Sequence, residues 1–425
     1  MAVTVMIVCF FVMIMLTVPI AFALAASALV GLALAGTAPL LVVTQKIFDG
    51  GDSFVLLAIP LFIVAGALME TGGISARLVD LARALIGHVR GGLGMVVVFA
   101  EALFSGLSGS TIADVSAIGS LLVPPMIKAG FKPERAVAII SAASAMGIMI
   151  PPCLLMVIMA QVAGLSVGAL FLAGFIPAAV LALGIMGLIY AQARRDGIDG
   201  DRRATLREVL VACRRALVPL MMPVIIFGAI LGGIADPTEA AVIAVFYAFI
   251  VGVFVYKEIT WAQLPRILVD SAVISSIVIF LVGAASSFSW ILAAEQVPVE
   301  LGRLMTSFSD QPWVFFAVSM AIFIVLGAIL EGLPALIICM PIFLPIATRL
   351  GIDPLHYATV TIAALGIGLF LPPIGAGLYV AASFANLRMD QMLRPMMPYI
   401  AVLCVGLLVL ILFPWLTLVL PRLFL

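Results

Sequence analysis

Long apolar stretches separated by short polar ones cover the whole chain of 425 residues. A membrane-spanning helix needs about 20 apolar residues to cross a hydrocarbon core of about 30 Å. Residues 2–35 are too long for one such span and contain Val18-Pro19, so this segment predicts two short helices, followed by a loop at 36–52. Single spans are predicted at 53–70, 167–192, 216–233, 238–255, 268–293 and 396–420.

Two polar segments interrupt this pattern in different ways. Residues 74–89 carry charged side chains at helical spacing opposite leucines, which predicts an amphipathic helix in the plane of the membrane interface. Residues 194–215 form the longest hydrophilic run of the chain. We interpret this run as a linker between two halves.

Each half contains a pair of short apolar segments. The first pair lies on either side of Gly106–Thr111 and the second on either side of Glu331-Gly332. The four arms are 92–104, 112–127, 313–329 and 333–348. Irregular backbone at membrane depth persists only where protein or a watery cavity satisfies its polar groups. The two pairs therefore predict re-entrant helical hairpins with polar tips.

Helix-breaking residues recur in one ungapped register, 221 positions apart. The pairs are Gly106 and Gly327, Pro124 and Pro345, Gly130 and Gly351, Pro133 and Pro354, Gly147 and Gly368, and Pro151-Pro152 and Pro372-Pro373. Segments 134–163 and 356–386 are interrupted within this register, which predicts a broken helix in each half. Five crossings and one hairpin per half place the second half upside down relative to the first, the inverted-repeat plan of secondary transporters. The sequence thus predicts an all-α polytopic membrane protein with ten crossings, two hairpins and two broken helices.

Composition agrees with this class. Hydrophobic residues make up 65% of the chain and charged residues 10%, whereas a soluble domain carries about 25% charged residues. The formal net charge of +0 argues against a nucleic-acid partner, and five cysteines without a CxxC pair argue against a disulfide framework or zinc site. With the N-terminus outside, 17 of the 21 Lys and Arg residues fall on the cytoplasmic side, as the positive-inside rule requires.

The broken helices are the first candidates for chemistry. Pro151 and Pro372 lack a backbone donor and disfavour helix just before them, which frees carbonyls at 147–150 and 368–371. Exposed carbonyls beside hydroxyls suit Na⁺, while helix N-termini attract a carboxylate. Glycine and proline also kink membrane helices for packing alone. Their repetition in register beside two polar tips favours an ion site.

The hairpin tips supply the remaining polar groups. Asp114 is an acid inside the membrane and by that position a functional candidate, although capping of its own helix fits the position equally well. The predicted substrate contacts are Ser110, Thr111, Asp114, Glu331 and Gly332. No phosphate-binding loop or nucleophile motif is present, so we expect neither ATP hydrolysis nor enzyme activity in this chain.

Several stretches together carry a family resemblance. They are Leu107–Asp114, Ile118–Ser120, Ile150–Pro152, Gly232–Ala241, Glu331–Thr348, Gly351–Pro354 and Pro372–Gly375. In combination they resemble the large membrane subunit of tripartite ATP-independent periplasmic (TRAP) transporters, the DctM type. The likeness covers essentially the whole chain.

This resemblance implies an elevator-type, Na⁺-coupled importer of a small organic acid, such as a C4-dicarboxylate, in the bacterial inner membrane. It implies no cofactor besides the coupling ion. It also implies two partners, a small four-helix membrane subunit (DctQ type) and a periplasmic substrate-binding protein (DctP type). We expect the small subunit to be a separate chain.

The resemblance further assigns residues to two Na⁺ sites. The first comprises Ser108, Ser110, Gly147, Ile150 and Pro151, and the second comprises Gly327, Gly368, Leu371 and Pro372. The chain departs from the family at Leu371, where the family usually has Thr, and at Gly377, where it often has Asn. Since a leucine offers a carbonyl but no hydroxyl, we expect the second Na⁺ site to differ from the family pattern.

The predicted organisation separates a scaffold from a transport unit. The scaffold comprises residues 1–90 with the interfacial helix and residues 216–300; the transport unit comprises residues 91–193 and 301–425, with the basic linker at 194–215 between the halves. One alternative is a stand-alone Na⁺/dicarboxylate symporter or ion antiporter of the same build. Another is an intramembrane enzyme or a channel. An enzyme needs paired acids, histidines or a metal constellation inside the membrane, and the sequence indicates none.

Overall fold

Helix ends recur along the chain at the spacing of the repeated glycines and prolines. Helices α7 (Thr111–Lys128) and α16 (Gly332–Arg349) begin and end 221 positions apart, and α8 (Pro133–Gly147) and α17 (Pro354–Leu369) begin 221 positions apart. Helices α6 (Gly92–Ser108) and α7 pack together as the first hairpin, and α15 (Pro312–Leu330) and α16 pack as the second. The predicted all-α fold with repeated halves, two hairpins and two broken helices is confirmed.

The structure is a computed structural model that describes residues 1–108, 110–308 and 311–425, without the side chains of 107, 108 and 304–308. The other helices of the first half are α1 (Ala2–Met15), α2 (Ile20–Ala35), α3 (Leu41–Gly51), η1 (Phe54–Leu57), α4 (Ala58–Thr71), α5 (Ile74–Ile86), α9 (Leu154–Ala163) and α10 (Val167–Asp196). Those of the second half are α11 (Leu206–Leu231), α12 (Pro237–Ile250), η2 (Val251–Val255), α13 (Leu264–Ala294), α14 (Val297–Phe308), α18 (Ala376–Ser383), α19 (Met389–Leu412) and α20 (Trp415–Phe424).

Nine helical segments within the described ranges are long and apolar enough to cross a membrane. Three of them are the hairpin arms α7, α15 and α16. Each arm begins and ends within one residue of its predicted bounds, except that α6 continues to Ser108 and not to residue 104. Length alone does not separate an arm from a crossing here, so the number of ten crossings stays a prediction.

Side-chain caps begin several helices at positions that the sequence motifs contain. Asp236 accepts hydrogen bonds from the backbone of Thr238 (2.7 Å) and Glu239 (2.9 Å), and Glu239 accepts one in return from the backbone of Asp236 (3.0 Å). This capping box starts α12, with Pro237 in the first turn where its missing N–H costs nothing. Asp353 caps α17 from one side only, accepting from the backbone of Leu355 and His356 next to Pro354. These motif residues have a structural role.

Two predictions about polar segments were wrong. Residues 36–52 are not one loop, because Leu41–Gly51 form α3, which packs against α13 and carries the Lys46–Asp49 ion pair (3.2 Å) along its surface. The linker is also shorter than 194–215, since α10 continues to Asp196 and α11 begins at Leu206. Only residues 197–205 remain outside helices, and they are held in place, because the Asp201 N–H donates to the Gly87 carbonyl (2.8 Å).

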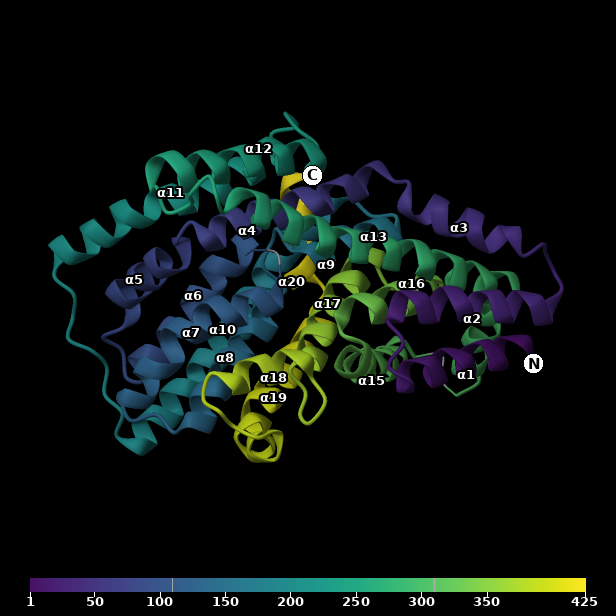
Figure 1. Cartoon of the computed structure of the whole chain (residues 1–425). Coiled ribbons are helices and arrows are strands. Elements are labelled where there is room, and N and C mark those ends of the chain that lie inside the picture. Colours follow the sequence, from purple (N-terminus) through teal and green to yellow (C-terminus); the bar gives the residue numbers. More distant parts are fainter. Residues whose placement is uncertain (109, 309–310) are drawn as a thin grey trace.

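The helices of the predicted scaffold lie toward the two ends of the molecule. Figure 1 shows α1, α2 and α3 beside α13 at one end of the molecule and α5 and α11 at the other. The two broken helices meet between them, where a Cβ on Gly366 of α17 would lie 2.5 Å from the Ala145 carbonyl of α8. Each hairpin packs on the broken helix of its own half. The amphipathic helix predicted at 74–89 is α5.

Candidate functional site

The two broken helices end in the same backbone geometry. The Ile150 N–H donates to the Gly147 carbonyl (2.8 Å), and at the equivalent place the Leu371 N–H donates to the Gly368 carbonyl (2.9 Å). The prediction of carbonyls without partners was therefore wrong at Gly147 and Gly368. A carbonyl has two lone pairs, so each of these oxygens can still accept a second bond. The following Pro-Pro peptide bond is cis in both halves.

The first hairpin lies directly on the first break. A Cβ on Gly106 would lie 2.8 Å from the Pro151 carbonyl, so only glycine permits this approach. The hydroxyl of the preceding residue, Ser105, lies 2.8 Å from the Gly147 carbonyl and 2.7 Å from Oδ2 of Asp114. A hydroxyl has one hydrogen, so it satisfies at most one of these two acceptors fully.

A second acid, Glu101, completes this cluster. Its side chain is fully buried, and its Oε1 accepts from the Ser144 hydroxyl (2.5 Å). Its Oε2 is buried with no hydrogen-bond partner among the described residues and lies 3.8 Å from the Cβ position of Gly147. The expectation that the chain has no paired acids inside the membrane was wrong. Glu101 interrupts an apolar helix, the same signal that singled out Asp114.

The chemistry of this cluster favours a cation. Two carboxylates and one carbonyl gather at this break, and a serine hydroxyl bonds to each of them. Buried charges are normally paired or bound to a metal, because an isolated charge in an apolar interior costs several kcal/mol. Carboxylate, carbonyl and hydroxyl oxygens are the ligands of hard cations, as in transporters that bind Na⁺ at broken helices. The residues present therefore fit the Na⁺ that the sequence predicts here.

The second break lacks this cluster. The positions 221 residues after Glu101, Ser105, Asp114 and Ser144 hold Ile322, Leu326, Ala335 and Leu365. In their place the second hairpin approaches the backbone of α17, where a Cβ on Gly368 would lie 2.4 Å from the Ile324 carbonyl. The Leu371 carbonyl already accepts from Ile374 (3.2 Å) and Gly375 (2.8 Å). The two halves share a backbone plan and differ in charge.

Comparison with known proteins decides the family. Residues 7–416 match the family model of the tripartite ATP-independent periplasmic transporter, DctM component. The chain belongs to this family. It is 40% identical to YgiK of Salmonella typhimurium, over 96% of the chain and 94% of that protein. It is 37% identical to the C4-dicarboxylate TRAP transporter large permease protein DctM of Pseudomonas aeruginosa, over 89% of the chain and 88% of that protein.

A solved structure supports the fold of this TRAP large permease subunit. The YdaH transporter of Alcanivorax borkumensis matches with a TM-score of 0.65 over 90% of the chain and 88% of that protein, at 15% sequence identity. At this identity the likeness concerns the fold alone. Membership of a transporter family agrees with the prediction that the chain is not an enzyme. The family and the long apolar helices together show that the chain is a multi-pass integral membrane protein.

The predicted substrate residues at the hairpin tips of this TRAP subunit differ in their exposure. Ser110 and Glu331 are exposed, whereas Asp114 is fully buried in the cluster with Ser105. Glu331 has φ 64° and ψ 175°, a backbone region that essentially only glycine occupies. A residue with a side chain loses about 1–3 kcal/mol of stability by adopting it. Such outliers concentrate at functional sites. The side chain of Ser108, predicted as an Na⁺ ligand, lies outside the described part of the structure.

The second hairpin tip also meets the first broken helix. A Cβ on Gly332 would lie 3.7 Å from Leu155 of α9, although these residues belong to different halves. Thr111 is half-buried at the start of α7. The structure thus brings hairpin one, the first break and the beginning of α16 together around one region. The second set of predicted Na⁺ ligands, including Pro372, lies at the other break.

Proposed function

We propose that this TRAP large permease subunit imports a small organic acid together with Na⁺, and that the first broken helix holds the coupling cation. The observation that carries this proposal is the buried pair Glu101 and Asp114 beside the Gly147 carbonyl. A cation entering this cluster compensates two buried negative charges at once. We assign Glu101, Ser105 and Asp114 to this site in addition to Gly147.

The proposed substrate class follows from the family and from the site. Relatives of this subunit are named for C4-dicarboxylate, isethionate, 2,3-diketo-L-gulonate and sialic acid. All four are small organic acids with a negative charge. The exposed N-terminal end of α7 at Ser110 offers backbone N–H groups to such an acid. We therefore propose a hydrophilic carboxylate or sulfonate as the substrate.

The packing of the hairpins supports an elevator motion. Hairpin one contacts the first broken helix at the Gly147 carbonyl through the Ser105 hydroxyl, and at Pro151 through Gly106. Hairpin two lies against α17 at Gly368, close to the Ile324 carbonyl. Elements packed this closely cannot slide past each other, so each hairpin travels with its broken helix. We propose that the hairpins and broken helices slide together against the outer helices and carry the cation site across the membrane. The membrane proposed is the inner membrane of a bacterium. A four-helix small subunit and a periplasmic binding protein are the proposed partners.

Reconstitution tests this function directly. Proteoliposomes holding this subunit with its small membrane subunit should take up a radiolabelled acid, with C4-dicarboxylate, isethionate and sialic acid as the first candidates, when a binding protein and an inward Na⁺ gradient are supplied. Uptake should persist without ATP and stop when K⁺ replaces Na⁺. Full uptake driven by a proton gradient alone would refute Na⁺ coupling. Saturable uptake without any binding protein would favour the stand-alone symporter.

The Ser105 hydroxyl provides a sharper test of the cation site. In Ser105→Ala the affinity for Na⁺ should fall at least about tenfold, because one hydrogen bond to a charged group contributes about 1.5–3 kcal/mol. Ser141→Ala is the matched control, since Ser141 is a buried serine of α8 whose hydroxyl has no partner in the described structure. Na⁺ titration of the melting temperature measures both variants. Equal losses in the two variants would contradict the assignment.

A further inference from the structure

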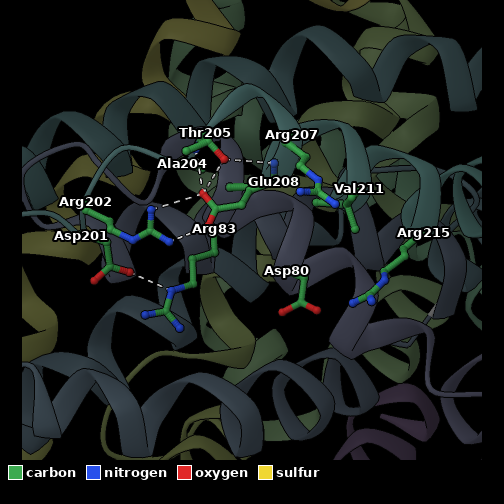
Figure 2. Close-up of a pocket in the computed structure, with 12 residues that line it drawn as sticks. Asp80, Arg83, Asp201, Arg202, Ala204, Thr205, Arg207, Glu208, Val211 and Arg215 are labelled. Carbon is green, nitrogen blue, oxygen red and sulfur yellow. Dashed lines mark hydrogen bonds and ion pairs between the residues drawn. The ribbon is translucent and has the colours of Figure 1, made fainter.

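An open pocket of about 910 Å³ lies away from the broken helices, between α5, residues 197–205 and the start of α11. Its lining is rich in charge, as Figure 2 shows. Two of its arginines are neutralised by neighbours, Arg83 by Asp201 (2.7 Å) and Arg202 by Glu208 (2.5 Å). The volume falls within the range of about 300–1,000 Å³ of ligand pockets.

The charges that remain define what this pocket can bind. Arg207 and Arg215 line it and form no ion pair within the described ranges, and Asp80 is likewise unpaired there. In Figure 2 Asp80 lies between the Arg83–Asp201 pair and Arg215. The uncompensated charge is therefore one positive unit. A phosphodiester matches it, since arginine donates two parallel hydrogen bonds to phosphate oxygens.

The surroundings of the pocket indicate a lipid and not a soluble anion. All the arginines of α11 occur in its first ten residues, and the rest of the helix is apolar, so the pocket lies at the boundary between charged and apolar surface. Among the same ten residues Leu206, Leu210 and Val211 are exposed, and Val211 lines the pocket. Exposed apolar side chains thus stand beside the pocket arginines at this end of α11.

We propose that this pocket binds the headgroup of an anionic glycerophospholipid. The phosphodiester contacts Arg207 and Arg215, and the glycerol end of the acyl chains meets the exposed Val211 side chain in the pocket wall. Basic pockets between membrane helices bind anionic headgroups by this chemistry. Because α5 and residues 197–205 form the other walls, a bound lipid joins the two halves of the chain. This site is independent of the cation site and of the transported acid.

Lipid binding to the purified subunit tests the proposal. Native mass spectrometry in detergent should detect one tightly bound phosphatidylglycerol, and phosphatidylcholine with the same acyl chains should bind much more weakly. The double variant Arg207→Gln/Arg215→Gln should lose about 30-fold in affinity for phosphatidylglycerol. The control Arg203→Gln/Arg214→Gln removes the same charge from exposed arginines outside the pocket and should change the affinity less than about threefold. Equal losses in the two double variants would overturn the site.

Asp80 supplies a test of opposite sign. Asp80→Asn removes the unpaired acid from the pocket and should tighten phosphatidylglycerol binding about threefold. Weaker binding in this variant would indicate a headgroup with an ammonium group on Asp80 and overturn the anionic assignment. Inorganic phosphate is the soluble probe. If millimolar phosphate displaces all of the phosphatidylglycerol, the pocket belongs to a soluble anion and the lipid proposal fails.

Discussion

The double variant Glu101→Gln/Asp114→Asn is expected to lose the stabilisation that Na⁺ gives to the wild-type protein. A ligand that binds only the folded state stabilises it by about 2.7 kcal/mol at one hundred times its Kd. The proposed cation compensates two fully buried carboxylates, and breaking a buried ion pair costs about 3–5 kcal/mol. The affinity for Na⁺ should therefore fall at least about a hundredfold. Melting curves in NaCl and in KCl measure this difference.

The same variant has a second expected property in the absence of Na⁺. Without a cation, the wild-type protein buries two carboxylates within one cluster, whereas the variant buries two neutral amides of similar shape. Its melting temperature in KCl should therefore equal or exceed that of the wild type. Asp52→Asn is the control, since Asp52 is exposed and forms no ion pair in the described structure. A variant that Na⁺ stabilises as strongly as the wild type would place the cation elsewhere.

The repeated architecture could be predicted because its signals are local and occur twice. Proline restricts the backbone and glycine frees it wherever they stand, so their recurrence placed the predicted starts within two residues of those of α7, α16, α8 and α17. The hydrophobic pattern located the spans for the same reason. It failed at α3, where three charged residues in a short segment indicated a loop. In the structure, Val43 is buried while Lys46 and Asp49 pair on the surface.

The composition of the cation site could be predicted only in part. Gly147 was identified from its place before a Pro-Pro pair, and Asp114 as an acid in an apolar segment. Glu101 carried the same signal, but only the packing of α6 against α8 shows that it joins Asp114 around one carbonyl. Sequence spacing does not report such a contact, because the two acids lie on different arms of the hairpin. The apolar residues at the equivalent positions of the second half show that this cluster is not repeated, but the sequence alone does not indicate which positions to compare.

A glycine series tests whether the second hairpin and its broken helix form one body. A Cβ on Gly368 would lie 2.4 Å from the Ile324 carbonyl and 3.1 Å from the Ala328 nitrogen, and backbone atoms cannot rotate away as a side chain does. Gly368→Ala should therefore force α15 and α17 apart. Overpacking of this kind costs about 1–3 kcal/mol or more. We expect a lower melting temperature and loss of most uptake.

Two further glycine substitutions, one less crowded and one in open space, serve as comparisons for Gly368→Ala. A Cβ on Gly327 would meet Leu365 atoms at 3.2–3.4 Å, a tight contact that small shifts relieve, so Gly327→Ala should cost less than Gly368→Ala. Gly187 in α10 has nothing within 4 Å of its Cβ position, and Gly187→Ala should raise stability by about 0.5–1 kcal/mol, because alanine favours a helix. Melting temperature and Na⁺-driven uptake should then fall in the order Gly187→Ala, Gly327→Ala, Gly368→Ala. If Gly368→Ala transports as well as Gly187→Ala, the hairpin and α17 do not move as one body, and the proposed elevator motion loses its structural basis.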